Sequence, residues 1–428
     1  MAGHVRSVSS RGAGPLAPDA TVVVVGASLA GLRAVETLRG NGFHGNVVLV
    51  GDEVHLPYER PPLSKQVLAG EWPPERTVLA DRRRLDELRV DQRLGRRAVS
   101  LDPEATSVVL DDGSTVEGDA VVVATGARPR PLPGSPDGVA VLLRTLGDAE
   151  ELRRRVLASG PEARVVVVGA GFIGSEVAST CSRLGCRVTV VVAAPTPLSL
   201  ALGEEVGRAC GAMHERNGVE LRTGIGVRAV RGAGAEGSTD GRGSGVVELA
   251  DGSSLPADVV VVGIGVVPNV EWLEGSGLQL GNGVVCDHAL FAADRVVAAG
   301  DCARWHWRHD GREELLRIEH WQMAVDGGVA AAHALLAGRA AAPDFDPVPY
   351  FWSDQYGLKI QMIGHPDPDD QIAVVDGSLD EERFVVLYGR SGRLTAAMGV
   401  GRPRQLMVYR PLLSAGASWD ESLALGRD

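Results

Sequence analysis

Two stretches of the chain share one pattern of apolar and polar positions. In residues 21–53, a run of valines at 22–25 precedes a glycine-rich turn, and a second apolar run occupies 47–50. Uninterrupted β-branched runs are typical of strands buried on both faces. Between the runs, apolar residues recur at helical spacing at Leu29, Leu32, Val35 and Leu38. The pattern predicts a strand, a tight turn, a helix and a second strand.

The same pattern recurs at residues 164–192, where Ile173, Val177, Cys181 and Leu184 mark the apolar face of the helix. Its glycine-rich turn lies about 140 residues after the first one. Two βαβ openings so far apart predict two nucleotide-binding domains rather than one duplicated loop. The predicted fold class is therefore α/β, with two Rossmann-like domains.

The rest of the chain differs from these two stretches in composition and in predicted secondary structure. Beyond about residue 335, short strand-like stretches and many aromatic residues predict a smaller α+β domain. Residues 231–245 are rich in Gly and Ser and predict a flexible hairpin tip. Residues 1–20 mix Ser, Gly, Pro and Arg without an apolar core and predict a disordered tail rather than a signal peptide.

Charge and hydropathy exclude two classes of partner. The net charge of −12 argues against general affinity for nucleic acids or acidic membranes. The longest uncharged, mainly apolar stretch, 188–203, is short and is broken by Pro195 and Pro197, so no membrane span is expected.

The five cysteines form no metal-binding spacing. Cys181 and Cys186 are expected to straddle a helix end with side chains pointing about 140° apart, which favours buried thiols over a disulfide. A reducing, cytoplasmic location is therefore expected.

The glycines of the second turn have the spacing of a dinucleotide-binding motif. Gly169 would make the turn, Gly171 would let the backbone approach a pyrophosphate, and Gly174 would let helix and strand pack closely. The motif lies between a predicted strand and a predicted helix, which is the context in which this spacing indicates dinucleotide binding.

The first turn carries Gly26, Ser28 and Gly31, with serine in the middle position, where its Cβ would crowd a phosphate slightly. Asp52, or the adjacent Glu53, follows the next strand, where an acid can accept ribose hydroxyls. Two dinucleotide sites in one chain suggest a flavin and a nicotinamide, because hydride passes from a bound donor to a bound acceptor.

Asp301 follows another strand-like run, at 296–300. Its carboxylate would reach the ribityl chain of a flavin. The alternative is that Asp301 only caps the element after the strand.

Several motifs in order along the chain resemble one family. The sequence contains GASLAG, LPYERPPLSK, ATGARPRPLPG, LRTLGDAE, GAGFIGSE, GIGVVPN, AAGDCA, RIEHW and PYFWSDQYG. Together they resemble the FAD-dependent NAD(P)H:ferredoxin reductases, such as putidaredoxin reductase and biphenyl dioxygenase ferredoxin reductase. These enzymes serve bacterial cytochrome monooxygenases and ring-hydroxylating dioxygenases.

The resemblance implies a glutathione-reductase-like FAD/NAD(P) fold. Its expected parts are a split FAD-binding domain at 21–124 and 264–335, an NAD(P)-binding domain at 125–263 and a C-terminal interface domain at 336–428.

The resemblance also implies site residues. The FAD-binding set would be Gly26, Ser28, Ala30 and Gly31 at the pyrophosphate, Asp52 at the adenosine ribose, Lys65 at the isoalloxazine, Ala98 near the adenine end, Arg144, Asp301 and Trp321. The NAD-binding set would be Gly169, Gly171, Phe172, Ile173, Gly174 and Glu176.

Lys65 is one of only two lysines in the chain, with Lys359. In the family, the lysine of PPLSK pairs with the glutamate of the second glycine motif beside the reactive ring nitrogen of the flavin, which here implies Lys65 and Glu176 as the catalytic pair. Lysine is a compact point charge, whereas the planar fork of arginine would block nicotinamide stacking. The alternative is a surface lysine after a turn.

A helix expected at 317–338 would begin near the flavin and stabilise a reduced, anionic ring through its dipole, with Trp321 covering the ring edge. Core packing alone is the alternative role for Trp321.

The expected electron acceptor is an acidic 2Fe–2S ferredoxin, because the first domain lacks the Cys-x4-Cys pair of disulfide reductases. A basic docking face is one interpretation of Arg304, Arg308, Arg312, Arg402 and Arg404, and scattered solvated arginines are the other. The competing functions are an NADH oxidase or peroxidase, and a redox sensor or interaction protein similar to the apoptosis-inducing factors.

The choice of nicotinamide cofactor depends on the end of the second strand of the NAD(P)-binding domain. NADH-using relatives often have a glutamate there, but this chain has Val192. No arginine follows to bind a 2′-phosphate. NADH is expected on family grounds, with NADPH as a second possibility.

Overall fold

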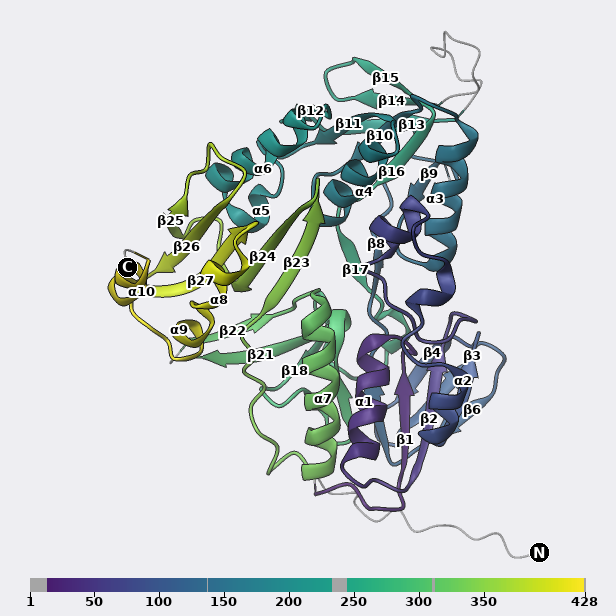
Figure 1. The fold of residues 1–428 in the computed structure, drawn as a ribbon. Helices are drawn as coiled ribbons and strands as arrows, with labels where there is room; N and C mark the ends of the chain where they lie inside the picture. The colour runs from purple at the N-terminus through teal and green to yellow at the C-terminus, as the bar shows by residue number, and fades with distance from the viewer. Residues whose placement is uncertain (1–13, 137, 233–244, 310–311, 427–428) are drawn as a thin grey trace, which may run out of the picture. The chain divides into compact units, whose positions relative to one another are not determined.

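The computed structural model describes residues 14–136, 138–232, 245–309 and 312–426. They divide into two compact units, and Figure 1 gives the course of the chain through each. The first unit comprises residues up to 58, 79–127 and 268–347; the second comprises 59–78, 128–267 and residues from 348. The chain passes between the units within the short strands β8 (Ala127–Pro129) and β17 (Val266–Pro268).

The first unit is built on a sheet in the order β19-β20-β7-β1-β2-β3. Its strands are β1 (Thr21–Val25), β2 (Asn46–Gly51), β3 (Val90–Leu94), β7 (Ala120–Val123), β19 (Phe291–Ala293) and β20 (Val296–Ala298). β1 lies in the middle and pairs in parallel with β2 and β7, so its valines are buried on both faces, as the sequence predicts.

Helices α1 (Leu29–Gly40) and α7 (Trp321–Ala337) lie side by side in this unit (Figure 1). A Cβ on Gly328 of α7 would lie 2.3 Å from the Ala30 carbonyl oxygen of α1, so only glycine permits this approach. The remaining elements are α2 (Arg82–Glu87), β4 (Ala98–Asp102), β5 (Ser107–Leu110), β6 (Thr115–Glu117), η3 (Glu271–Leu273), β18 (Val284–Cys286), η4 (Gly300–Cys302), β21 (Ala303–His309) and β22 (Arg312–Leu316).

The second unit contains the other Rossmann-like sheet, in the order β12-β11-β10-β16-β9. Its strands are β9 (Ala140–Leu142), β10 (Arg164–Val168), β11 (Arg187–Val192), β12 (Glu220–Thr223) and β16 (Val259–Val262), and its helices are α3 (Leu146–Ala158), α4 (Phe172–Arg183), α5 (Ser199–Leu202) and α6 (Glu204–Arg216). β13 (Val227–Arg231), β14 (Gly245–Leu249) and β15 (Ser254–Ala257) form a small antiparallel sheet.

Residues 59–78 belong to the second unit and carry η1 (Leu63–Val67), a π-helical turn, and η2 (Pro74–Thr77). Thr180 Oγ1 on α4 donates to the Ser64 carbonyl at 2.8 Å, so the turn is fastened to the helix that follows the second glycine motif. The four-part domain division made from the sequence stays a prediction.

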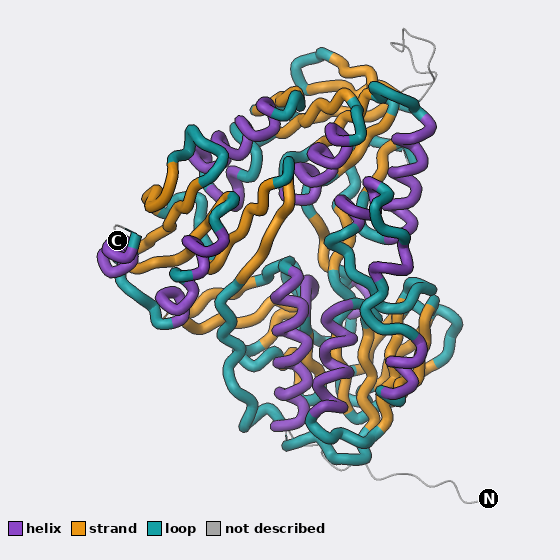
Figure 2. Tube along the Cα trace, in the orientation of Figure 1, coloured by secondary structure: helices purple, strands orange, loops and turns teal. Residues whose placement is uncertain are grey.

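The C-terminal part of the second unit is an antiparallel sheet in the order β23-β24-β27-β26-β25, followed by short helices; Figure 2 shows this concentration of strands near the C-terminus. Its elements are β23 (Tyr350–Gln355), β24 (Leu358–Gly364), β25 (Gln371–Gly377), β26 (Phe384–Arg390), β27 (Arg393–Val400), α8 (Pro403–Met407), α9 (Arg410–Ser414) and α10 (Trp419–Leu425). Phe384 and Met398 of this sheet share a core with Met213 of α6. The predicted fold class, with a small C-terminal α+β domain, is confirmed.

Two expectations about chain ends and loops have different outcomes. The described end of the predicted disordered tail is packed: Leu16 is buried, and its N–H donates to the Leu335 carbonyl at 3.1 Å, because an apolar side chain there can cover α7. The hairpin tip predicted at 231–245 lies almost entirely outside the described residues. Within the described part of the chain, no helix is both long enough and apolar enough to cross a membrane.

Candidate functional site

The turn between β1 and α1 is tight because two glycines permit it. Gly26 has a φ of +123°, and a Cβ there would lie 2.0 Å from the Ala124 carbonyl oxygen. A Cβ on Gly31 would lie 1.9 Å from the Gly26 carbonyl oxygen. The first turn of α1 is therefore held against the end of β1, with its amide groups at the carboxyl end of the sheet, where nucleotides bind in this kind of fold.

The helices after the two glycine turns begin without local capping. Ser28 and Gly171 are the N-cap residues of α1 and α4; among the described residues neither supplies a side-chain cap, and neither helix has an acid in its first turn. By contrast, α3 begins with a complete capping box from Thr145 and Asp148. Uncapped N–H groups and the positive end of the helix dipole favour an anion, so both sites fit a pyrophosphate.

The carboxyl ends of other parallel strands bring further predicted residues to the same edge of the first sheet. Asp52 directly follows β2 and is exposed, and Asp301 follows β20 in η4 and is half-buried. A Cβ on Gly300, whose φ is +72°, would lie 3.0 Å from Cβ of Ala30, so η4 lies against the start of α1. Gly26, Asp52 and Asp301 therefore share one edge, as a nucleotide site requires.

Trp321 is the first residue of α7 and is half-buried. The helix begins at Trp321 and not at residue 317 as predicted, because Arg317 and Glu319 form an ion pair at 2.7 Å in extended chain and Arg317 donates to the Asp301 carbonyl at 3.0 Å. Ala98 begins β4 and is buried.

Two members of the predicted FAD-binding set belong to the second unit. Arg144 precedes Thr145, the N-cap residue of α3; its N–H donates to Asp148 at 3.0 Å, and its carbonyl accepts from Arg60 at 2.8 Å. Lys65 lies in η1. The predicted set is thus divided between the two units.

The second glycine turn has the geometry of the first, except that Gly171 stands at the position that Ser28 occupies in the first turn. A Cβ on Gly169, whose φ is +102°, would lie 2.2 Å from the Gly263 carbonyl oxygen, and one on Gly174 would lie 2.2 Å from the Gly169 carbonyl oxygen. A Cβ on Gly171 would meet its nearest atom only at 4.0 Å. Gly171 therefore faces open space of the kind a phosphate group needs.

The two residues after Gly171 have different environments. The ring of Phe172 packs on Phe351 with centroids 4.2 Å apart, so its side chain joins α4 to β23 of the C-terminal sheet. Ile173 is 43% exposed at the start of α4. Of the two side chains, that of Ile173 is therefore the more accessible to a ligand at the turn.

Lys65 and Glu176 form a buried ion pair. Nζ of Lys65 lies 3.0 Å from Oε1 of Glu176, and both residues are less than 9% exposed. Pro61 and Pro62 precede the π-helical turn and restrict the backbone that presents the lysine. The predicted pairing is present, although 110 residues separate the two along the chain. Their role beside a flavin stays a prediction.

Two serines that the sequence reasoning missed complete the surroundings of Glu176. Ser64 Oγ donates to Oε2 of Glu176 at 2.5 Å, and Ser353 Oγ donates to Oε1 at 2.8 Å. Both lie inside motifs that carried the family resemblance, PPLSK and FWSDQ, which is the signal that could have found them. Lys65 also borders a pocket of about 520 Å³ shared with Gln66 and Tyr356.

The cysteines correct one expectation. Cys181 and Cys186 are free thiols but do not point apart: they share a side-chain hydrogen bond. This hydrogen bond, together with burial, raises the pKa of Cys181. It lowers the pKa of Cys186, although burial acts in the opposite direction there. The prediction was wrong because α4 ends at Arg183 and the chain folds back through Gly185, whose φ is +84°. The helical geometry that the prediction assumed from Cys181 to Cys186 therefore ends before it reaches Cys186.

Cys302 is the cysteine nearest in sequence to Asp301, and it is a core thiol. It is fully buried, its Sγ lies 3.4 Å from the Ala299 carbonyl oxygen, and burial raises its pKa. A thiol in this state is a poor nucleophile.

The arginines considered for a docking face do not form one cluster within a unit. Arg304 and Arg308 belong to the first unit, where Arg304 donates to the Gly281 carbonyl at 2.7 Å. Arg402 and Arg404 belong to the second, where Arg402 pairs with Asp376 at 2.8 Å. The side chain of Arg312 lies outside the described part of the structure.

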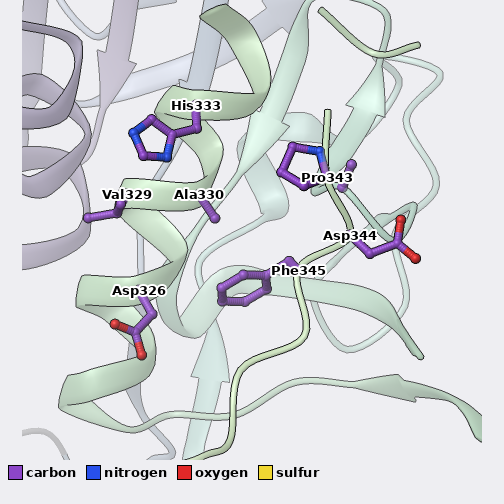
Figure 3. Close-up of a pocket in the computed structure, with 8 residues that line it drawn as sticks. Asp326, Val329, Ala330, His333, Pro343, Asp344 and Phe345 are labelled. Carbon is purple, nitrogen blue, oxygen red and sulfur yellow. The ribbon is translucent and has the colours of Figure 1, made fainter. Parts of the chain in front are cut away.

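A separate pocket of about 250 Å³ lies on α7 in the first unit (Figure 3). The helix contributes Asp326, Val329, Ala330 and His333, and the segment after it contributes Pro343, Asp344 and Phe345. None of the predicted site residues lines it.

Comparison with known proteins shows which family this chain belongs to. Residues 20–328 match the model of the pyridine nucleotide-disulphide oxidoreductase family, and residues 350–426 match the reductase C-terminal model. Rhodocoxin reductase of Rhodococcus erythropolis is 37% identical over 420 residues, which is 95% of each chain. Putidaredoxin reductase CamA of Pseudomonas putida is 36% identical over 416 residues, covering 94% of this chain and 95% of that protein.

Among solved structures, the covalent complex of putidaredoxin reductase with putidaredoxin contains a chain that matches with a TM-score of 0.86 and 34% identity over 95% of both chains. Likeness over nearly the whole length, in sequence and in structure, is what common descent produces. The chain therefore belongs to the pyridine nucleotide-disulphide oxidoreductase family, and within it to the FAD-dependent ferredoxin reductases.

Proposed function

We propose that this protein is an NAD(P)H-dependent flavoprotein that passes electrons from NADH through FAD to a 2Fe–2S ferredoxin serving a monooxygenase or dioxygenase. The observation that carries the proposal is the presence, in one chain, of two glycine turns that each deliver an uncapped helix N-terminus. Relatives over nearly the whole length are named as reductases of ferredoxins, including the ferredoxin–NAD(+) reductase component of an anthranilate 1,2-dioxygenase system.

Bound FAD would supply the redox chemistry that links a two-electron hydride donor to a one-electron acceptor. Gly26, Ser28, Ala30 and Gly31 would hold its pyrophosphate at the start of α1. The carboxylates of Asp52 and Asp301 would accept hydrogen bonds from its hydroxyl groups, and Ala98, Arg144 and Trp321 would complete its surroundings.

The nicotinamide cofactor would lie with its pyrophosphate at the start of α4, where Gly171 leaves room for it. Gly169 and Gly174 hold the turn, and Phe172 and Ile173 follow at the start of the helix. The Lys65 ammonium would favour negative charge where hydride arrives, and Glu176 would hold that ammonium in place.

The state of Cys302 gives no support to the oxidase or peroxidase alternative. Enzymes of that kind use a reactive cysteine near the flavin, and Cys302 is buried with a raised pKa. The five cysteines are free, which fits a reducing compartment, so the cytoplasm is the proposed location.

The test is a steady-state assay of cytochrome c reduction with NADH or NADPH, with and without a panel of 2Fe–2S ferredoxins, some acidic and some not. We expect rapid reduction only when NADH and a ferredoxin are both present, with an acidic ferredoxin favoured. Fast oxygen consumption without ferredoxin would identify an oxidase. A long-lived charge-transfer complex after NADH addition, with no turnover, would identify a redox sensor.

Selectivity between the two nicotinamides gives a second prediction. Val192 ends β11 and is half-buried, where a glutamate would accept hydrogen bonds from the adenosine ribose. We expect Val192→Glu to raise the preference for NADH over NADPH about tenfold, because the new carboxylate also repels a 2′-phosphate. The ratio of kcat/KM values measures this, with Val192→Gln as the uncharged control. An unchanged ratio would show that the ribose does not lie at this strand end.

A further inference from the structure

The carboxylate of Glu176 is surrounded by donors from separate parts of the second unit. Lys65 and Ser64 come from η1, and Ser353 comes from β23 of the C-terminal sheet. Glu176 is 5% exposed, Ser64 is 4% exposed, and Ser353 has no exposed surface. A buried carboxylate is costly unless charged or hydrogen-bonding groups replace its water, and here three such groups do so.

The direction of the hydrogen bond from Ser353 is determined by its other neighbour. The Gln355 side-chain amide, which is also buried, donates to Ser353 Oγ at 3.0 Å. A serine hydroxyl has one hydrogen to donate. Since Gln355 supplies a hydrogen to this oxygen, the hydrogen of Ser353 itself is directed at Oε1 of Glu176, 2.8 Å away.

Oε1 is the same oxygen that faces the Lys65 ammonium, at 3.0 Å. Ser353 and Lys65 therefore meet on one carboxylate oxygen, while Ser64 holds the other. A carboxylate fixed at both oxygens cannot rotate freely, so the position of the ammonium that it attracts is restricted as well.

We propose that Ser353 is a positioning residue for hydride transfer: its hydroxyl, oriented by Gln355, holds Glu176 so that the Lys65 ammonium stays in its catalytic place. The inference rests on the proposed function and extends it to the C-terminal sheet. The hydroxyl is not needed for the strand itself, because the backbone of β23 pairs with β24 from Tyr350 to Gln355.

The experiment is anaerobic stopped-flow reduction of the FAD-loaded protein by NADH. We expect Ser353→Ala to lower the limiting rate of flavin reduction about tenfold, since a hydrogen bond to a charged group is lost. The dissociation constant for NADH and the rate of reduction by dithionite should stay within about twofold, because neither depends on the ammonium's position. The matched control is Ser422→Ala, which removes another fully buried serine hydroxyl of the second unit, one that donates to the Ser418 carbonyl instead.

Two isosteric variants, Ser353→Thr and Ser353→Val, provide a second test if the alanine variant loses its flavin. Threonine and valine have nearly the same shape, and both suit a strand, but only threonine keeps the hydroxyl. Ser353→Thr should reduce flavin about tenfold faster than Ser353→Val. Equal rates in the pair would overturn the inference, as would an unchanged rate in Ser353→Ala.

A double-mutant cycle separates positioning from general support of the fold. In a Glu176→Gln background, Ser353→Ala should cause almost no further loss of rate, because its effect passes through the carboxylate. An equal further loss would show that Ser353 acts elsewhere. Failure of NADH to reduce the unmodified protein would instead reject the proposed function, so the two failures are distinguishable.

Discussion

Lys65→Met is expected to slow reduction of the bound flavin by NADH about 100-fold, with FAD retained. Methionine keeps the length and volume of the side chain but removes the ammonium that lies 3.0 Å from Oε1 of Glu176. The rate of hydride transfer decreases because the ammonium stabilises the negative charge that develops in the transition state of that step. Stopped-flow absorbance under anaerobic conditions measures the rate, and the visible flavin spectrum measures FAD occupancy.

The chain supplies a matched control in its other lysine. Lys359 lies on β24, is half exposed and approaches Asp354 only at 3.8 Å, so Lys359→Met should leave the rate unchanged. Lys65→Arg keeps the positive charge but replaces a compact ammonium by a planar fork, and it should remain slow. A Lys65→Met protein that is reduced at the normal rate would remove Lys65 from the catalytic pair.

Gly171→Asp is expected to raise the KM for NADH about 100-fold without unfolding the protein. Gly171 has an extended conformation, with φ −76° and ψ −179°, and its Cβ would enter open space, so the backbone accepts the change. Aspartate is also a better N-cap than glycine by a few tenths of a kcal/mol, so α4 should be slightly stabilised. The new carboxylate would occupy the place of the pyrophosphate and repel it.

The uncharged control for this variant is Gly171→Ala, which adds only the Cβ. Its KM should rise much less than that of the aspartate variant, because the main effect is electrostatic. Steady-state kinetics give KM, and thermal unfolding monitored by circular dichroism checks that the helix persists. A normal KM in Gly171→Asp would mean that the nicotinamide cofactor binds elsewhere.

Local patterns were sufficient to predict the frame of the site. The buried valine strands follow from the stiffness of β-branched side chains. The turns follow from the positive φ of Gly26 and Gly169 and from the carbonyls of these two glycines, which leave no room for a Cβ at Gly31 and Gly174, five residues later. These features are visible in the sequence because each depends on residues that are close together along the chain. The close approach of the Ala124 and Gly263 carbonyls to Gly26 and Gly169 is a tertiary contact that adds to them.

Features that depend on tertiary contacts were harder to predict. The pairing of Lys65 with Glu176 came from family resemblance, since nothing in their spacing brings them together. Ser353 was missed because a serine in a strand has a special role only when its neighbours are known. The Cys181–Cys186 prediction failed because extrapolated helical geometry does not apply beyond Arg183.

The excursion of residues 59–78 into the second unit has a consequence for building chimaeras. A transplant of residues 128–267 alone, intended to exchange nicotinamide specificity between relatives, would carry Glu176 into its new host without its native Lys65, Ser64 and Ser353. The imported acid would then depend on the host's own side chains to neutralise it. The part to be transplanted is therefore discontinuous: it must also include residues 59–78 and the C-terminal sheet.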